Sequence, residues 1–465
     1  MKRIIALSIV LIMAVLFTAC AKKAEPAGKE TAAETVAETV AQNTPVETEA
    51  ETDTEYEEVT EAIPEESPEE RVSVSVWREI PVADSPALLH PDIKTTFEGG
   101  QAPDNRMIFE LSYPLITLAQ DEAEKYPELN TAILEDFDNY CIQTAQEDRE
   151  RLEESFNPDM LNDEYFGTLT CKRTAEVLRA DENFFSVRVD LVSYMGGAHG
   201  QSVRECFTYS TQDGSLITPK DVFVSKDALV TALKEKLEAI PDVEYFNLDE
   251  DLDSHDFENG RLADNIYYNM GLTGDGVIFY FNQYELAPYA AGEQIVLLSY
   301  NEYADIMNPV FSKTADSYVY PLNENAEYDT RSGKLVFSNG YDEYSTVRSA
   351  KIRLDGKDYE FETFTYHPKQ YLVQAGDRTF IYAFEDADDD DDFIHVMEIT
   401  KGEAKDCGKV EKRLYSVNEE AEIHTILDAN CYARSDTVKA FTDPMEMVLQ
   451  DGKIYYVGED GMPAK

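Results

Sequence analysis

The stretch of this chain best suited to chemistry is rich in glycine and contains a histidine. Ser193–Gly200 has the sequence Ser-Tyr-Met-Gly-Gly-Ala-His-Gly, and His199 is one of only six histidines in 465 residues. A histidine suits a general base, because its charge changes near neutral pH. No serine, cysteine or aspartate stands out as its partner. We therefore favour a tight turn in which Gly196 and Gly197 allow unusual backbone angles and the ring of His199 packs or caps a backbone group.

A second stretch combines a strand-like aromatic run with a rigid loop. Phe279–Gly292 has the sequence Phe-Tyr-Phe-Asn-Gln-Tyr-Glu-Leu-Ala-Pro-Tyr-Ala-Ala-Gly. We expect it to display Tyr284, Pro288 and Tyr289. Tyrosine rings are large, have few rotatable bonds and end in a polar group, so they make good binding residues. The alternative is a structural loop whose rings cover the edge of a sheet.

An acidic run could bind a metal ion. Residues 385–392 have the sequence Glu-Asp-Ala-Asp-Asp-Asp-Asp-Asp, and Asp388, Asp390 and Asp392 offer oxygen ligands of the kind that calcium prefers. The Asp/Asn-Gly spacing of an EF-hand loop is absent, so the alternative is a solvated hairpin tip. We expect no other cofactor. With 93 acidic residues in the chain, the sequence cannot nominate a glycosidase pair.

The overall charge excludes some partners and favours others. The chain has 93 Asp and Glu against 40 Lys and Arg, a formal net charge of −53. Nucleic acid is not expected as a partner, because phosphate binding needs clustered Lys and Arg. A cationic protein is favoured instead, since long-range electrostatic attraction speeds its approach.

The N-terminus predicts export. Lys2 and Arg3 precede an apolar run over residues 4–17, and Cys20 follows two small residues. This pattern is typical of a secretory signal peptide, here residues 1–19. It resembles a bacterial lipoprotein leader, which implies acylation of Cys20 and a lipid anchor in the membrane. The alternative is an ordinary secreted or single-anchor protein in which the cysteine occurs by chance. Residues 20–71, rich in Glu, Thr, Ala and Pro, predict a disordered acidic tether.

The remaining chain predicts two folded regions. Residues 72–308 carry alternating strand patterns and two amphipathic helices, one of which has Leu229, Leu233 and Leu237 on its buried face. We expect an α+β fold, with an antiparallel sheet that has helices on one face. Residues 309–465 contain short strands punctuated by Asn-Gly and Asp-Gly, which predicts a separate all-β domain, either a sandwich or a partial propeller.

The cysteines leave their pairing open. Cys171 and Cys206 fall in predicted neighbouring strands and are one candidate pair; Cys407 and Cys431 are another. That arrangement would leave Cys141 buried in a helix. The alternative is that all five remain reduced in the core.

Several motifs together resemble a known family. They are Gly196–Gly200, Thr208-Tyr-Ser, the segment 213–223 and the segment 280–292. In order and spacing they are similar to the bacterial extracytoplasmic domain of unknown function 3298. The preceding stretch, with Tyr113-Pro and the helix around Asn130, resembles its usual companion, the PdaC-type N-terminal domain. The resemblance covers about residues 110–305.

The resemblance implies an α+β fold in the cell envelope but no single activity. RsiV-like relatives are anti-sigma factors whose outer domain binds lysozyme, and PdaC-like relatives carry a peptidoglycan deacetylase. We expect neither function to transfer whole. Only three residues precede the apolar run, and no two histidines are four apart, as a deacetylase metal site needs. We expect a lipid-anchored, non-catalytic binding module for lysozyme or wall glycan. The alternative is a wall-glycan hydrolase using His199 or unplaced carboxylates.

Overall fold

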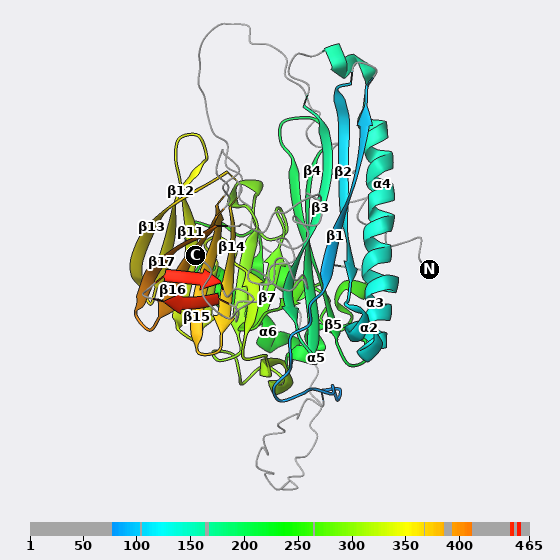
Figure 1. The fold of residues 1–465 in the computed structure, drawn as a ribbon. Helices are drawn as coiled ribbons and strands as arrows, with labels where there is room; N and C mark the ends of the chain where they lie inside the picture. The colour runs from blue at the N-terminus through cyan, green and yellow to red at the C-terminus, as the bar shows by residue number, and fades with distance from the viewer. Residues whose placement is uncertain are drawn as a thin grey trace, which may run out of the picture. The chain divides into compact units, whose positions relative to one another are not determined.

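The computed structural model describes residues 77–102, 105–162, 167–263, 266–366, 368–385, 393–411, 447–450 and 453–456. The described chain mixes helices and strands, which confirms the mixed α and β character expected from the sequence (Figure 1). The signal peptide, the acidic tether, Cys20 and the acidic positions Asp388, Asp390 and Asp392 lie outside the described residues. None of the helices in the described parts of the chain combines the length and the apolar character needed to cross a membrane.

The first sheet has the strand order β1-β2-β3-β4-β5. Its strands are β1 (Asp92–Gln101), β2 (Met107–Thr117), β3 (Leu169–Ala180), β4 (Phe184–Tyr194) and β5 (Gln201–Ser210). Neighbouring strands are antiparallel except β2 and β3, which are parallel. Parallel neighbours need a crossover connection, and the helical segment between β2 and β3 supplies it. The expectation of an antiparallel sheet is therefore wrong at this pair.

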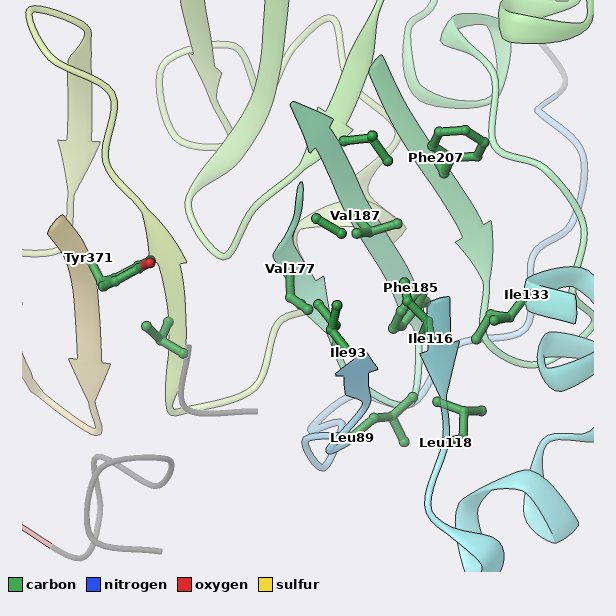
Figure 2. Close-up of a cluster of buried hydrophobic side chains, with 14 of the residues drawn as sticks. Leu89, Ile93, Ile116, Leu118, Ile133, Val177, Phe185, Val187, Phe207 and Tyr371 are labelled. Carbon is green, nitrogen blue, oxygen red and sulfur yellow. The ribbon is translucent and has the colours of Figure 1, made fainter. Parts of the chain in front are cut away.

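The crossover consists of a series of helices that pack on the first sheet. They are α2 (Gln120–Lys125), α3 (Pro127–Ala132), the π-helical η1 (Ile133–Asp138), α4 (Asn139–Ser155) and the 3-10 helix η2 (Pro158–Asn162). Figure 2 shows Ile133 of η1 near Ile116 of β2 and Phe185 of β4, all of them buried. The three- and four-residue spacing of apolar residues along this segment explains why one face is buried.

A second, three-stranded sheet carries the other main helix. Its antiparallel strands are β6 (Met270–Leu272), β7 (Gly276–Phe281) and β8 (Gln294–Ser299). The helices of this region are α5 (Pro219–Val222), α6 (Lys226–Glu238), α7 (Leu248–Ser254) and the short 3-10 helices η3 (Gly260–Leu262), η4 (Tyr289–Ala291) and η5 (Pro309–Ser312). The predicted face of α6 is confirmed, because Leu229, Leu233 and Leu237 are buried in one cluster with strands β7 and β8. Whether the helices cover one face only stays a prediction.

The C-terminal region consists of strands in the described residues after η5. One antiparallel sheet contains β10 (Glu327–Thr330), β11 (Gly333–Tyr341), β12 (Val347–Leu354) and β13 (Lys357–Thr365). Another contains β9 (Tyr318–Pro321), β14 (Lys369–Ala375), β15 (Arg378–Glu385), β16 (Phe393–Thr400) and β17 (Glu403–Glu411), and β18 (Met447–Gln450) pairs with β19 (Lys453–Tyr456). Both larger sheets contribute to one apolar cluster, for example Phe337 and Ile352 from the first and Leu372 and Ile381 from the second.

The apolar clusters do not end at the proposed boundary between residues 308 and 309. The cluster around Phe337 also contains Leu178 of β3 and Tyr280 of β7, and Tyr371 of β14 belongs to the cluster drawn in Figure 2. Residues on both sides of this boundary therefore contribute side chains to the same buried clusters. The expectation of a separate C-terminal domain stays a prediction.

A polar contact reinforces this shared core. Asp275, in the turn between β6 and β7, accepts hydrogen bonds from the hydroxyl groups of Tyr318 (2.5 Å) and Tyr320 (2.7 Å) of β9. Burial raises the pKa of Asp275 to about 6, although both hydroxyls stabilise its charged form. The neighbouring residue is a glycine for a steric reason, because a Cβ at Gly274 would lie 2.3 Å from the ring of Tyr318.

Two dipeptides that favour turns, Asp355-Gly356 and Asn339-Gly340, had different outcomes. Asp355 and Gly356 form a two-residue hairpin turn between β12 and β13, both with positive φ (48° and 81°), as a mirror-image turn requires. Asn339-Gly340 is not a turn. It lies inside β11, where the pairing with β12 shifts next to Gly340. A Cβ at Gly340 would lie 2.1 Å from Oγ of Ser349, so the close approach of the two strands explains the glycine there.

The proposed disulfide between Cys171 and Cys206 is wrong. Both thiols are free and buried, as are those of Cys141 and Cys407. Cys171 lies on β3 and Cys206 on β5, and β4 separates these strands. The two side chains accordingly belong to different apolar clusters. Cys431, the proposed partner of Cys407, lies outside the described residues.

Candidate functional site

The glycine-rich stretch forms the tight turn that joins β4 to β5. Gly196 and Gly197 have φ of +88° and +102°, a region that side chains with a Cβ rarely adopt. A Cβ at Gly200 would lie 2.7 Å from the carbonyl oxygen of Ser193. His199 is exposed, and its Nδ1 lies 3.0 Å from the carbonyl oxygen of Gly200. Because a carbonyl only accepts, this geometry fits the tautomer with a proton on Nδ1. The turn expected from the sequence is present.

The aromatic stretch forms the loop between β7 and β8. Tyr284 is exposed and has a positive φ of 69°, which is unusual for a residue other than glycine. Pro288 precedes η4, which begins at Tyr289. Pro288 is exposed, whereas Tyr289 is only half-buried.

The base of this loop is held by a buried histidine that the sequence did not single out. The backbone N–H of Asn282 donates to Oε2 of Glu285 at 2.8 Å. The other carboxylate oxygen of Glu285 lies 2.8 Å from Nε2 of His255. His255 is fully buried, and its Nδ1 lies 2.7 Å from the carbonyl oxygen of Asp251. Nothing in the local sequence signals this contact, because His255, which follows α7, lies 30 residues before Glu285 in the chain.

The two loops meet through their rings. The ring centroids of His199 and Tyr289 are 4.5 Å apart, with an angle of 31° between the planes. Those of Tyr289 and Tyr284 are 5.5 Å apart, at 38°. Tyr289 therefore lies between the other two, and its hydroxyl oxygen is 3.5 Å from the carbonyl oxygen of Gly200. We call His199, Tyr284 and Tyr289 the ring cluster.

The contacts of His199 bear on whether it could act as a catalytic base. Among the described residues, its partners are the carbonyl oxygen of Gly200 and the ring of Tyr289. Neither can act as a nucleophile or as an orienting carboxylate, which a histidine general base needs around it. Nor do the described residues contain three or more His, Cys, Asp or Glu side chains grouped closely enough to hold a metal ion.

A partly buried ionic network ties both ends of the aromatic loop to β5. Near the start of the loop, Oδ1 of Asn282 accepts from the backbone N–H of Arg204 at 2.8 Å. At its end, the carboxylate of Glu293 pairs with the guanidinium of Arg204. The same guanidinium lies 3.2 Å from Asp190 of β4 and donates to Asn323 at 3.2 Å. Arg204 therefore links the loop to the first sheet and to the C-terminal region.

The carboxyl group of Glu293 has a raised pKa. Burial raises its pKa to about 7, and the nearby positive charges of Arg204 and Arg188 only partly oppose this shift. Arg188 is itself engaged, because it donates to Asp190 at 2.7 Å and to the hydroxyl of Tyr280 at 3.0 Å. Nothing in the local sequence signals this network, since its members come from two sheets and from the loops between strands.

Comparisons with known proteins agree with part of the expected family resemblance. The chain carries, at residues 220–301, a domain that matches the family described as "Protein of unknown function (DUF3298)". This match includes the aromatic loop and begins after the turn that contains His199. No curated protein matches the chain.

Two solved structures are similar to this chain. One is a member of the DUF3298 family from Bacteroides fragilis NCTC 9343, with 20% sequence identity and a TM-score of 0.34; the match covers 48% of this chain and 96% of that one. The other is a DUF3298 family protein from Pseudomonas aeruginosa PAO1, with 18% identity and a TM-score of 0.32; it covers 48% of this chain and 97% of that one.

Proposed function

We propose that this protein is a non-catalytic binding module of the bacterial cell envelope, and that the ring cluster is its contact surface. The observation that carries the proposal is the packing of His199, Tyr289 and Tyr284 at the surface, from two separate loops. Rings of this kind supply contact area at a low cost in conformational entropy. The loops are joined to strands and held by buried contacts, so the surface is formed before a ligand arrives.

Two ligands remain candidates, each supported by a different feature. The net charge of −53 favours a strongly basic protein such as lysozyme, which RsiV-like relatives bind. The ring cluster favours wall peptidoglycan, because aromatic faces stack on sugar rings. The contacts of His199 support binding over the alternative, a wall-glycan hydrolase, since they supply no acid–base partner.

The proposal includes attachment to the membrane. Cys20 would carry the lipid, residues 20–71 would act as the tether, and a PdaC-type domain would precede the matched family domain. Support comes from the charged start, the apolar run and the cysteine of the leader. Metabolic labelling with a fatty acid tests this part. The wild type should incorporate the label and Cys20→Ala should not; equal labelling of both would contradict lipidation at this position.

Titration calorimetry and a wall-lysis assay test the binding function. We expect heat on adding lysozyme or soluble peptidoglycan fragments, and no release of wall fragments by this protein alone. Tyr289→Ala should weaken the binding, and Tyr344→Ala is the matched control, because Tyr344 is 78% exposed in the hairpin between β11 and β12. Absence of heat with both ligands would overturn the proposal, and release of wall fragments by the protein alone would favour the hydrolase.

A further inference from the structure

The loops that carry the ring cluster are unusual in this chain because they contain few charged residues. Residues 194–202 and 286–292 contain no Asp, Glu, Lys or Arg, although 29% of all residues are charged. The two carboxylates of the aromatic loop, Glu285 and Glu293, are directed to internal partners. Glu285 contacts His255 and Asn282, and Glu293 pairs with Arg204. The contact surface is therefore neutral on a strongly anionic protein.

The ring cluster is also open to solvent. Tyr284 is 51% exposed, and His199 is exposed at the other end of the row. A Cβ built at Gly197 or at Gly292 would meet nothing within 4 Å, so the backbone beside the rings is uncovered. The row thus offers aromatic faces next to backbone polar groups that a ligand can reach. Tyr289, half-buried between the other two rings, positions them.

We infer that the ring cluster binds neutral sugar units, and that wall glycan rather than a cationic protein occupies it. This inference rests on the proposed function and chooses between its two ligands. The C–H groups on one face of a pyranose carry slight positive charge and suit the negative face of an aromatic ring. Hydroxyl groups at the edge of the sugar form hydrogen bonds with neutral donors and acceptors. A basic protein surface instead needs carboxylates opposite its charges, and the two carboxylates of these loops, Glu285 and Glu293, already have internal partners.

The response to salt separates the two kinds of ligand. Stacking and neutral hydrogen bonds are insensitive to ionic strength, whereas attraction between opposite charges weakens as salt screens it. Tyr284 is the ring to remove, because its exposed side chain contributes little to the core. Loss of one stacked ring should weaken sugar binding about tenfold. Tyr284→Phe keeps the ring and should bind as the wild type does.

The experiment is calorimetric titration of the full chain with the neutral N-acetylglucosamine tetramer and, separately, with lysozyme, at low salt and at about 0.5 M salt. We expect the tetramer to bind equally at both salt concentrations, about tenfold more weakly to Tyr284→Ala, and normally to Tyr284→Phe and Tyr344→Ala. Thermal melting of each variant shows that it is folded.

Three results would overturn the inference. If lysozyme alone binds, and binding depends on Tyr284 and weakens with salt, the proposed function survives and the sugar assignment fails. If the tetramer binds Tyr284→Ala as tightly as the wild type, the sugar site lies elsewhere. If neither ligand binds, both the inference and the proposed function fail.

Discussion

The rings of His199 and Tyr289 pack with their centroids 4.5 Å apart, although the two residues belong to connections in different sheets. His199 lies between β4 and β5 of the first sheet, and Tyr289 lies between β7 and β8 of the second. The contact therefore joins two layers of the fold at the surface that we propose for binding.

Removing the histidine ring should weaken this junction slightly. We expect His199→Ala to lower the free energy of unfolding by about 1 kcal/mol, because one aromatic pair is lost at an exposed site. His199→Phe keeps a ring there and should restore most of the difference. Urea denaturation measures both variants. A loss above about 3 kcal/mol would mean that the ring supports the core and does more than form a surface contact.

The backbone of Tyr284 allows a test of strain that is separate from the loss of its ring. Both Tyr284→Ala and Tyr284→Gly remove the side chain, but only alanine must hold the positive φ of 69°. We expect the glycine variant to be more stable than the alanine variant by about 1 kcal/mol, since a left-handed conformation costs a residue with a Cβ that much. Equal stabilities in chemical denaturation would show that the loop changes conformation when the ring is removed.

The raised pKa of Glu293 predicts a pH dependence of stability. Burial raises this pKa to about 7, so the folded state holds the proton more firmly than the unfolded state does. The contribution of Glu293 to stability is therefore complete below its ordinary pKa and declines as pH rises toward about 7. In Glu293→Gln the side chain at this position does not ionise, so its contribution does not change with pH. Between about pH 5 and about pH 8 the difference in unfolding free energy should shift in favour of the variant, by on the order of 3 kcal/mol. A constant difference across this range would contradict the prediction.

The close approach of Gly274 to the ring of Tyr318 predicts that a larger residue at position 274 destabilises the protein. A Cβ at residue 274 would lie 2.3 Å from the Tyr318 ring, so Gly274→Ala should cost about 2–3 kcal/mol of unfolding free energy. Gly167→Ala is the matched control, because a Cβ there would lie at an ordinary 3.5 Å from its nearest neighbour. Thermal or urea unfolding compares them. Similar stabilities for the two variants would mean that the ring moves aside without cost.

The buried thiols predict slow chemical modification. Burial raises the pKa of Cys171 to about 11 and that of Cys141 to about 12, so little reactive thiolate forms near neutral pH. Mass spectrometry after alkylation should find both residues unmodified in the native protein and modified after unfolding. Without reductant, no peptide should link Cys171 to Cys206. A linked peptide would restore the disulfide that the structure contradicts.

Several elements whose signals are local were predicted correctly, although Asn339-Gly340 was not a turn. The leucines at positions 229, 233 and 237 predicted α6, because a helix brings residues at this spacing to one face. The pair Asp355-Gly356 predicted its hairpin turn, because both residues tolerate positive φ. The composition of the two loops also drew attention to the three members of the ring cluster, whose role in binding stays a prediction.

Relationships between distant segments were decided only by the tertiary structure. The order of the strands separated Cys171 from Cys206 by inserting β4, and the helical crossover made β2 and β3 parallel. The same packing brought His199 next to Tyr289 and placed Glu293 beside Arg204. Periodicity and turn residues act over a few neighbouring positions, so the sequence alone determined the local elements and the loops that stand out from them. Which loops meet, and which charges lose their water, depends on how whole sheets pack, and that depends on contacts summed over the entire chain.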